Sequence, residues 1–147
     1  MKLVFDIETD DLDAKNIWCI VAKDILSDQL YTYGPTQIEE GCQLLAEADE
    51  LIGHNIIGFD LPVLRDLTRF KTLGHGQSIV DTLVLSRLFD PVREAGHGLA
   101  TWGYKLGSKK IEFKSFAEGF TNEMLEYCIQ DVELNLLVYK ALREESR

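Results

Sequence analysis

The chain has 147 residues, of which 46% are hydrophobic, so it can bury one substantial core without the help of disulfides. Its formal net charge is -10, which argues against a tight grip on long duplex nucleic acid. No apolar run approaches the length of a membrane span, and the N-terminal segment lacks a signal-peptide pattern. We therefore expect one soluble, cytoplasmic domain over residues 1–147, with no membrane partner.

The three cysteines are widely spaced along the chain, at Cys19, Cys42 and Cys128. Their spacing fits neither a zinc-ligand pattern nor a redox pattern. We expect them to be reduced core residues of an intracellular protein.

Residues 2–8 form an apolar segment of β type that Asp6 and Glu8 interrupt. Residues two apart on a strand point to the same face, so both carboxylates should project together. Their repulsion would raise the pKa of each unless a cation lies between them, and hard oxygen ligands favour magnesium or manganese over zinc. The alternative for this pair alone is a strand end with solvated acids.

The next elements are predicted from alternation and turn residues. Strands are expected at about 17–23 and 28–34, as a meander with a turn near Ser27 and Asp28. Thr36-Gln-Ile-Glu39 has the form of a capping box and predicts a helix to about Ala48. A fourth strand is expected near residues 50–54.

The segment His54-Asn-Ile-Ile-Gly-Phe-Asp60 follows this strand. Pro62 suits the first turn of a helix, and the apolar residues after it recur at helical spacing. Asp60 should therefore lie near a helix N-terminus. Taken alone, it reads first as an ordinary N-cap residue, because aspartate is among the residues preferred there.

A fifth strand near residues 78–80 and helices near 82–88 and 99–106 complete the middle of the chain. Asp81 is expected to cap the helix that begins at Thr82, in preference to being a fifth ligand. Basic residues beside aromatic ones are candidates for contact with nucleic acid, with a solvated loop as the alternative: Lys105, Lys109 and Lys110, near Trp102, Tyr104 and Phe113.

The last helix is expected from about Asn122 to Glu145, capped by Thr121 or Asn122. Tyr127 and Asp131 are four residues apart, so they share one face, and apolar neighbours indicate that this face is turned inward. Polar side chains that face a core need partners. The two could bond to each other or to something polar, such as metal-bound water.

Together these patches read D-x-E, N-x-x-x-F-D and Y-x-x-x-D, in an order that resembles the three motifs of DEDD 3′-5′ exonucleases. The tyrosine resembles that of the tyrosine branch, because Glu126 stands where the histidine branch has histidine. Residues 81–88 and 97–107 resemble stretches of the proofreading domain of family A DNA polymerases from short-tailed bacteriophages. The chain is shorter than that domain between Leu88 and His97 and after Phe113, so trimmed loops are expected there, and no polymerase domain follows Arg147.

The resemblance implies a ribonuclease H-like α/β fold, a mixed five-stranded sheet flanked by helices, with the active site at the carboxyl ends of central strands. It implies two divalent cations, Mg²⁺ or Mn²⁺, which clamp the phosphodiester so that one activates a water and the other stabilises the departing 3′ oxygen. The implied ligands are Asp6, as the bridging residue, with Glu8, Asp60 and Asp131. Tyr127 would complete the catalytic set by orienting the attacking water.

The resemblance also implies residues that touch the substrate. Leu12 matches a leucine that wedges near the terminal base, and Phe59 matches an aromatic residue that contacts the terminal nucleotide. Asn55 matches a residue that fixes the loop or touches the substrate. Thr9 is a further candidate for contact with the substrate. Core packing is the alternative for Leu12 and Phe59.

The expected activity is 3′-5′ hydrolysis of single-stranded or frayed DNA ends, with release of nucleoside 5′-monophosphates. Two alternatives stay open. One is an exoribonuclease, because the sequence does not show how the pocket treats a 2′-hydroxyl. The other is a proofreading module that depends on a separate polymerase or replication partner.

Overall fold

The computed structural model describes residues 1–71, 76–108, 110 and 112–147. Within this part of the chain five strands form one sheet: β1 (Lys2–Thr9), β2 (Ile17–Asp24), β3 (Leu30–Tyr33), β4 (Glu50–Gly53) and β5 (Ser78–Asp81). Their order is β3-β2-β1-β4-β5. β1, β2 and β3 pair antiparallel, whereas β4 pairs parallel with both β1 and β5. The predicted mixed five-stranded sheet is confirmed.

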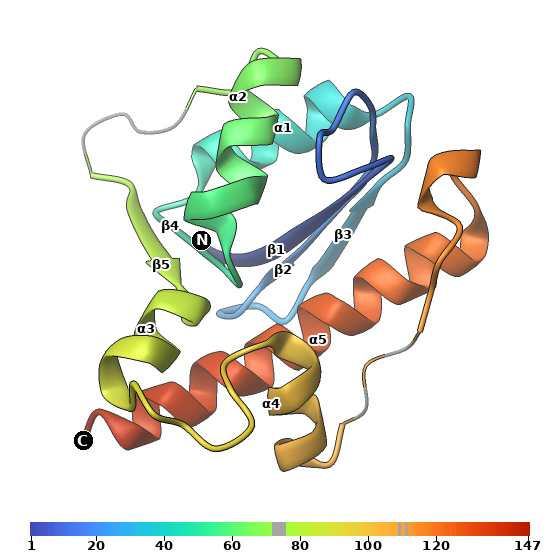
Figure 1. Cartoon of the computed structure of the whole chain (residues 1–147). Coiled ribbons are helices and arrows are strands. Elements are labelled where there is room, and N and C mark those ends of the chain that lie inside the picture. Colours follow the sequence, from blue (N-terminus) through green and yellow to red (C-terminus); the bar gives the residue numbers. More distant parts are fainter. Residues whose placement is uncertain (72–75, 109, 111) are drawn as a thin grey trace.

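Helices cover both faces of this sheet (Figure 1). The described helices are α1 (Ile38–Glu47), α2 (Leu61–Leu67), α3 (Thr82–Phe89), α4 (Leu99–Leu106) and α5 (Asn122–Glu145). α1 and α2 lie on one face, and the long α5 crosses the other, with α3 and α4 packed against α5. α5 begins as predicted, because the Thr121 hydroxyl accepts a hydrogen bond from the backbone N–H of Met124.

Strand alternation decides which side chains of β1 meet which helices. Leu3, Phe5 and Ile7 belong to the core under α1 and α2. Val4 points the other way and packs with residues of α5. Asp6 and Glu8 have the parity of Val4, so β1 presents both carboxylates toward α5.

The predicted start of α1 is wrong. Gln37 is the N-cap residue and makes no side-chain capping bond, so the helix begins two residues after Thr36. The Glu39 carboxylate accepts a hydrogen bond from the backbone N–H of Arg69 at 3.3 Å. The Gln37 side chain accepts one from the backbone N–H of Gly34 at 3.2 Å. Both side chains accept hydrogen bonds from backbone groups outside the helix, and no capping box forms.

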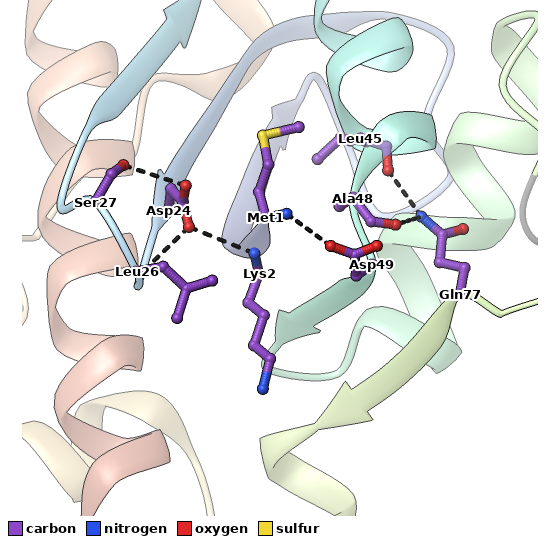
Figure 2. A network of polar contacts seen from close by, with 9 residues as sticks. All are labelled: Met1, Lys2, Asp24, Leu26, Ser27, Leu45, Ala48, Asp49 and Gln77. Atoms are coloured by element: carbon purple, nitrogen blue, oxygen red, sulfur yellow. Dashed lines mark hydrogen bonds and ion pairs between the residues drawn. The ribbon is translucent and has the colours of Figure 1, made fainter.

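A polar network ties the start of β1 to its neighbours (Figure 2). The N-terminal ammonium of Met1 pairs with Asp49 at 2.7 Å. The buried Asp24 carboxylate accepts from the backbone N–H of Lys2 at 3.4 Å and from the Ser27 hydroxyl at 3.1 Å. These contacts fix the end of β1 that lies opposite the acidic pair.

Among the described helices none is both long and apolar enough to cross a membrane. The three cysteines are free and buried, as predicted.

Candidate active site

The acidic pair lies at the carboxyl end of β1, where the pairing with β2 becomes irregular between Glu8 and Thr9. Asp6, Glu8 and Cys128 of α5 each place a ligand atom within 4.8 Å of the other two. The Cys128 thiol donates to a carboxylate oxygen of Asp6 at 3.7 Å. β1 and α5 thus meet at this point, as the shared parity of Asp6 and Glu8 predicts.

Asp60 comes to the site from the opposite side of the sheet. A short π-helical segment, η1 (Ile56–Asp60), runs directly into α2. Although Asp60 precedes α2, its side chain makes no capping bond. Its carboxylate is buried and accepts a hydrogen bond from the backbone N–H of Ile7 at 3.3 Å. The N-cap alternative is therefore wrong, and Asp60 faces the strand that carries the acidic pair.

Asn55 and Asp81 hold this segment in place. Asn55 has a φ of 62°, a left-handed conformation that asparagine tolerates better than most residues, and its side chain is exposed. The buried Asp81 carboxylate accepts from the backbone N–H groups of Asn55 at 2.8 Å and Ile57 at 3.0 Å. It also accepts from Leu83 and Val84, which confirms its capping role for α3. Of the two roles expected for Asn55, these contacts support loop fixing.

α5 brings Tyr127 and Asp131 to the site, but the two do not bond to each other. Lys110 lies between them: its ammonium donates to the Tyr127 hydroxyl and forms an ion pair with Asp131 at 3.1 Å. The other carboxylate oxygen of Asp131 is buried and has no hydrogen-bond partner among the described residues. Tyr127 and Asp131 thus share a lysine as their polar partner, and one carboxylate oxygen of Asp131 stays without a partner among the described residues.

Burial raises the pKa of each of the four carboxyl groups, and the charge of Asp6 adds to this rise in the other three. Burial raises the pKa of Asp6. Burial and then the charge of Asp6 raise the pKa of Glu8 to about 11 and that of Asp60 well above its ordinary value. The same two causes raise the pKa of Asp131 to about 7, although Lys110 opposes them. Burial also raises the pKa of Tyr127, so its hydroxyl is unsuited to act as a general base near neutral pH.

This donor set fits a hard divalent cation. Asp6, Glu8, Asp60 and Asp131 supply only oxygen ligands, which Mg²⁺ and Mn²⁺ prefer. The free buried oxygen of Asp131 is a polar atom that a cation would satisfy. Carboxyl groups that ionise poorly because they crowd one another are relieved by positive charge between them.

A pocket of about 480 Å³ opens beside Glu8. Three residues assigned to the substrate line it, namely Thr9, Leu12 and Phe59, together with Lys114 and Phe116. Leu12 is 87% exposed, so the alternative of core packing is wrong for it. Phe59 is half-buried against the core and also lines the pocket, so its core packing is confirmed and its contact with substrate stays a prediction. Asn55 does not line this pocket.

Aromatic residues from a late loop close the other side of the site. Phe113, Phe116 and Tyr127 form a cluster with ring centroids 5.0 to 5.9 Å apart. The Trp18 indole N–H donates to the carbonyl of Phe116 at 2.7 Å and pins the short turn η2 (Phe116–Glu118) to β2. A second pocket, of about 570 Å³, is lined by Tyr127 together with Lys110, Phe113 and Lys114.

Sequence reasoning missed several of these contributions. Lys110 was expected to contact nucleic acid from a loop, whereas it touches the carboxylate site itself. Lys109, expected beside it, lies outside the described residues. The ammonium of Lys105 lies 5.7 Å from the centroid of the Trp102 ring. Trp18 and Phe116 carry no pattern that marks them, because their contact joins residues 98 apart in sequence.

No protein-family model matches the chain. It is 29% identical to a DNA-directed DNA polymerase of Enterobacteria phage T3 and 27% identical to that of Escherichia phage T7, each over 97% of this chain. The chain spans only 26% of these polymerases. Each alignment covers 187 residues, as expected if this chain lacks segments that the relatives have.

The structure is similar to that of Brucella melitensis NrnC with bound Mg²⁺, at a TM-score of 0.71 and 18% identity, over 98% of this chain and 72% of that one. It matches the same nuclease bound to pGG at a TM-score of 0.70 and 19% identity, with the same coverage. It also matches the family B DNA polymerase of Pyrobaculum calidifontis, at a TM-score of 0.72 and 17% identity, over 95% of this chain and 24% of that one. The chain has the ribonuclease H-like fold of 3′-5′ exonucleases, with sequence similarity to one region of the T3 and T7 DNA polymerases.

Proposed function

We propose that residues 1–147 act as one metal-dependent 3′-5′ exonuclease domain that removes nucleoside 5′-monophosphates from single-stranded or frayed DNA ends. The observation that carries this proposal is that Glu8, Asp60 and Asp131, from β1, η1 and α5, all lie close enough to Asp6 for its charge to raise their pKa, beside a pocket lined by Leu12, Phe59 and Phe116. An acidic cluster alone could bind cations without catalysing a reaction. When apolar and aromatic side chains lie beside it, the bound cations can hold a phosphate while the terminal base stacks on those side chains.

Each residue then has a task. Asp6, Glu8, Asp60 and Asp131 would hold two divalent cations, Mg²⁺ or Mn²⁺, which supply charge neutralisation at the scissile phosphate and a reactive water. Phe59 and Leu12 would contact the terminal nucleotide from the pocket of about 480 Å³. Tyr127 keeps its proton and would orient the water through its hydroxyl. The similarity to NrnC with bound Mg²⁺ supports the metal, and that to phage DNA polymerases supports DNA.

The assay that tests this proposal follows matched 5′-labelled single-stranded DNA and RNA with Mg²⁺, Mn²⁺ or chelator. Asp131→Asn removes a proposed ligand at nearly constant volume. Glu126→Gln, an exposed carboxylate five residues earlier on α5, is the matched control. We expect a DNA ladder that shortens from the 3′ end and is lost with chelator or in Asp131→Asn, but kept in Glu126→Gln. Undiminished cleavage by Asp131→Asn would overturn the site assignment.

The same assay separates the alternatives. Faster shortening of RNA would select an exoribonuclease, and the pGG-bound form of NrnC makes short oligonucleotides worth including. Cleavage that appears only when a polymerase is added would indicate a module that depends on a partner. The cytoplasmic location stays a prediction.

A further inference from the structure

Lys110 is the basic side chain that, within the described chain, forms an ion pair with one of the four carboxylates. Its ammonium lies 3.1 Å from one oxygen of Asp131 and 3.8 Å from the centroid of the Tyr127 ring. The side chains of Lys110 and Asp131 are 22% and 8% exposed, so water screens this pair poorly. The contact is therefore stronger than an ordinary surface ion pair.

The segment around Lys110 is held by neighbours on both the sheet and α5. Phe113 and Phe116 pack against Tyr127, and the Trp18 indole fixes the carbonyl of Phe116. These contacts keep the loop against α5. The lysine is thus placed beside Asp131 by several independent interactions, which a freely moving surface lysine lacks.

The ammonium and a metal cation need the same carboxylate, that of Asp131. One oxygen of Asp131 is occupied by Lys110, and the other is buried without a partner in the described residues. A divalent cation that binds Asp131 would lie close to the ammonium, and two positive charges at such a distance repel strongly in a poorly hydrated site. Binding of the metal therefore requires the ammonium to move.

Lys110 also fixes the direction of the Tyr127 hydroxyl. Because the ammonium can only donate, the phenol oxygen accepts, and the phenol proton is left to donate to another group. Loss of the lysine removes this constraint.

We propose that the Lys110 ammonium is the internal counter-ion of the carboxylate site, holding Asp131 in the metal-free protein and competing with a divalent cation for it. The proposal rests on the proposed function, because it takes Asp131 as a metal ligand. Once displaced, the ammonium stays in the pocket of about 570 Å³ that it lines with Lys114, where it can meet a phosphate of the substrate. The ammonium thus exchanges the carboxylate of Asp131 for a phosphate of the nucleic acid.

The test measures binding of Mn²⁺ alone to the metal-free protein, by electron paramagnetic resonance of the unbound ion at one neutral pH. Lys110→Met keeps an apolar side chain over the Tyr127 ring but removes the charge, and Lys110→Arg keeps the charge. Lys140→Met is the control, since it removes an exposed charge on α5 that makes no ion pair in the described chain and lines neither pocket of the site. We expect Lys110→Met to bind Mn²⁺ about fivefold more tightly or better, the lower end of typical couplings between sites. Lys110→Arg should stay near the parent, and Lys140→Met should change little.

Unchanged or weaker binding in a folded Lys110→Met variant would overturn the inference while leaving the proposed metal site intact. An equal gain in Lys140→Met would overturn it too, because the effect would then be general charge. If neither the parent nor any variant binds Mn²⁺, the proposed function itself fails. Near-ultraviolet circular dichroism checks the fold, and Lys110→Gln replaces Lys110→Met if the latter does not fold.

Discussion

Replacing Asp131 with asparagine should stabilise the metal-free protein at high pH, even though it removes a proposed ligand. Asp131 is 6% exposed, and its pKa is raised to about 7 by burial and by the charge of Asp6. Because this pKa lies above the ordinary value of 3.8, the folded protein holds the proton more tightly than the unfolded chain does. The stability that this group contributes is fully present below about pH 4 and is lost as the pH rises through about 7.

The magnitude follows from the two pKa values. At ~1.4 kcal/mol per pKa unit, the difference between 3.8 and about 7 corresponds to about 4 kcal/mol lost by pH 8. Asparagine does not ionise, so the variant avoids this loss. The attraction of Lys110 needs no separate cost, because it already opposes the rise of this pKa to about 7. The gain at pH 8 is therefore about 4 kcal/mol, or roughly 8–16 °C in Tm for a chain of this size.

Thermal unfolding of the parent and Asp131→Asn at pH 5 and pH 8, first in chelator and then with Mg²⁺, checks this prediction. We expect the variant to be the more stable protein at pH 8 in chelator, and its advantage to shrink or reverse at pH 5. Mg²⁺ should raise the Tm of the parent far more than that of the variant. A stability difference that is the same at both pH values would refute the reasoning. Glu126→Gln, which changes an exposed carboxylate on the same helix, is the matched control.

Three further changes test other parts of the site. Tyr127→Phe keeps the ring that packs on Phe116 but removes the hydroxyl, so single-turnover cleavage should slow by roughly tenfold to a hundredfold with the fold unchanged; an unaltered rate would exclude the water-orienting role. Trp18→Phe loses the hydrogen bond to the carbonyl of Phe116, so KM should rise and stability should fall by about 1 kcal/mol; a change in kcat alone would contradict a role in holding the pocket. Asp81→Ala leaves three part-buried backbone N–H groups without their acceptor, which should cost about 3 kcal/mol in urea unfolding; the folded variant should bind Mn²⁺ as the parent does, and weaker binding would indicate that Asp81 is a ligand.

The sheet and its helices could be predicted because local patterns agree with their surroundings. β1 alternates between two apolar cores, and α5 has a capping residue and a buried face, so sequence and packing point to the same elements. The start of α1 could not be predicted in the same way. The capping box at Thr36 is a local pattern, but Glu39 bonds to the backbone of Arg69, thirty residues away, and this tertiary contact prevails.

The carboxylates could be predicted for the same reason. Asp6 and Asp131 each interrupt an apolar pattern on a face turned inward, and a buried carboxylate requires a charge or a metal to balance it. Lys110 lies in a loop without periodicity, so no local pattern predicts that it contacts Asp131. The inward position of Asp131 indicates only that some positive charge must balance it. The contact of Trp18 with Phe116 is likewise a consequence of the tertiary fold.

The residues predicted from local patterns and the residues placed by the tertiary fold therefore differ in their expected effect on the choice of substrate. Under the proposed function, the carboxylates of β1, η1 and α5 act on the phosphodiester, which DNA and RNA share. The late loop, in contrast, supplies Lys114 to both pockets, Phe116 to the pocket beside Glu8, and Phe113 to the other. Bases and sugars would then meet these side chains together with Leu12 and Phe59, because all of them line the two pockets. Substitutions in residues 112–118 should therefore change the preference between DNA and RNA, while substitutions among the four carboxylates should lower cleavage of both alike.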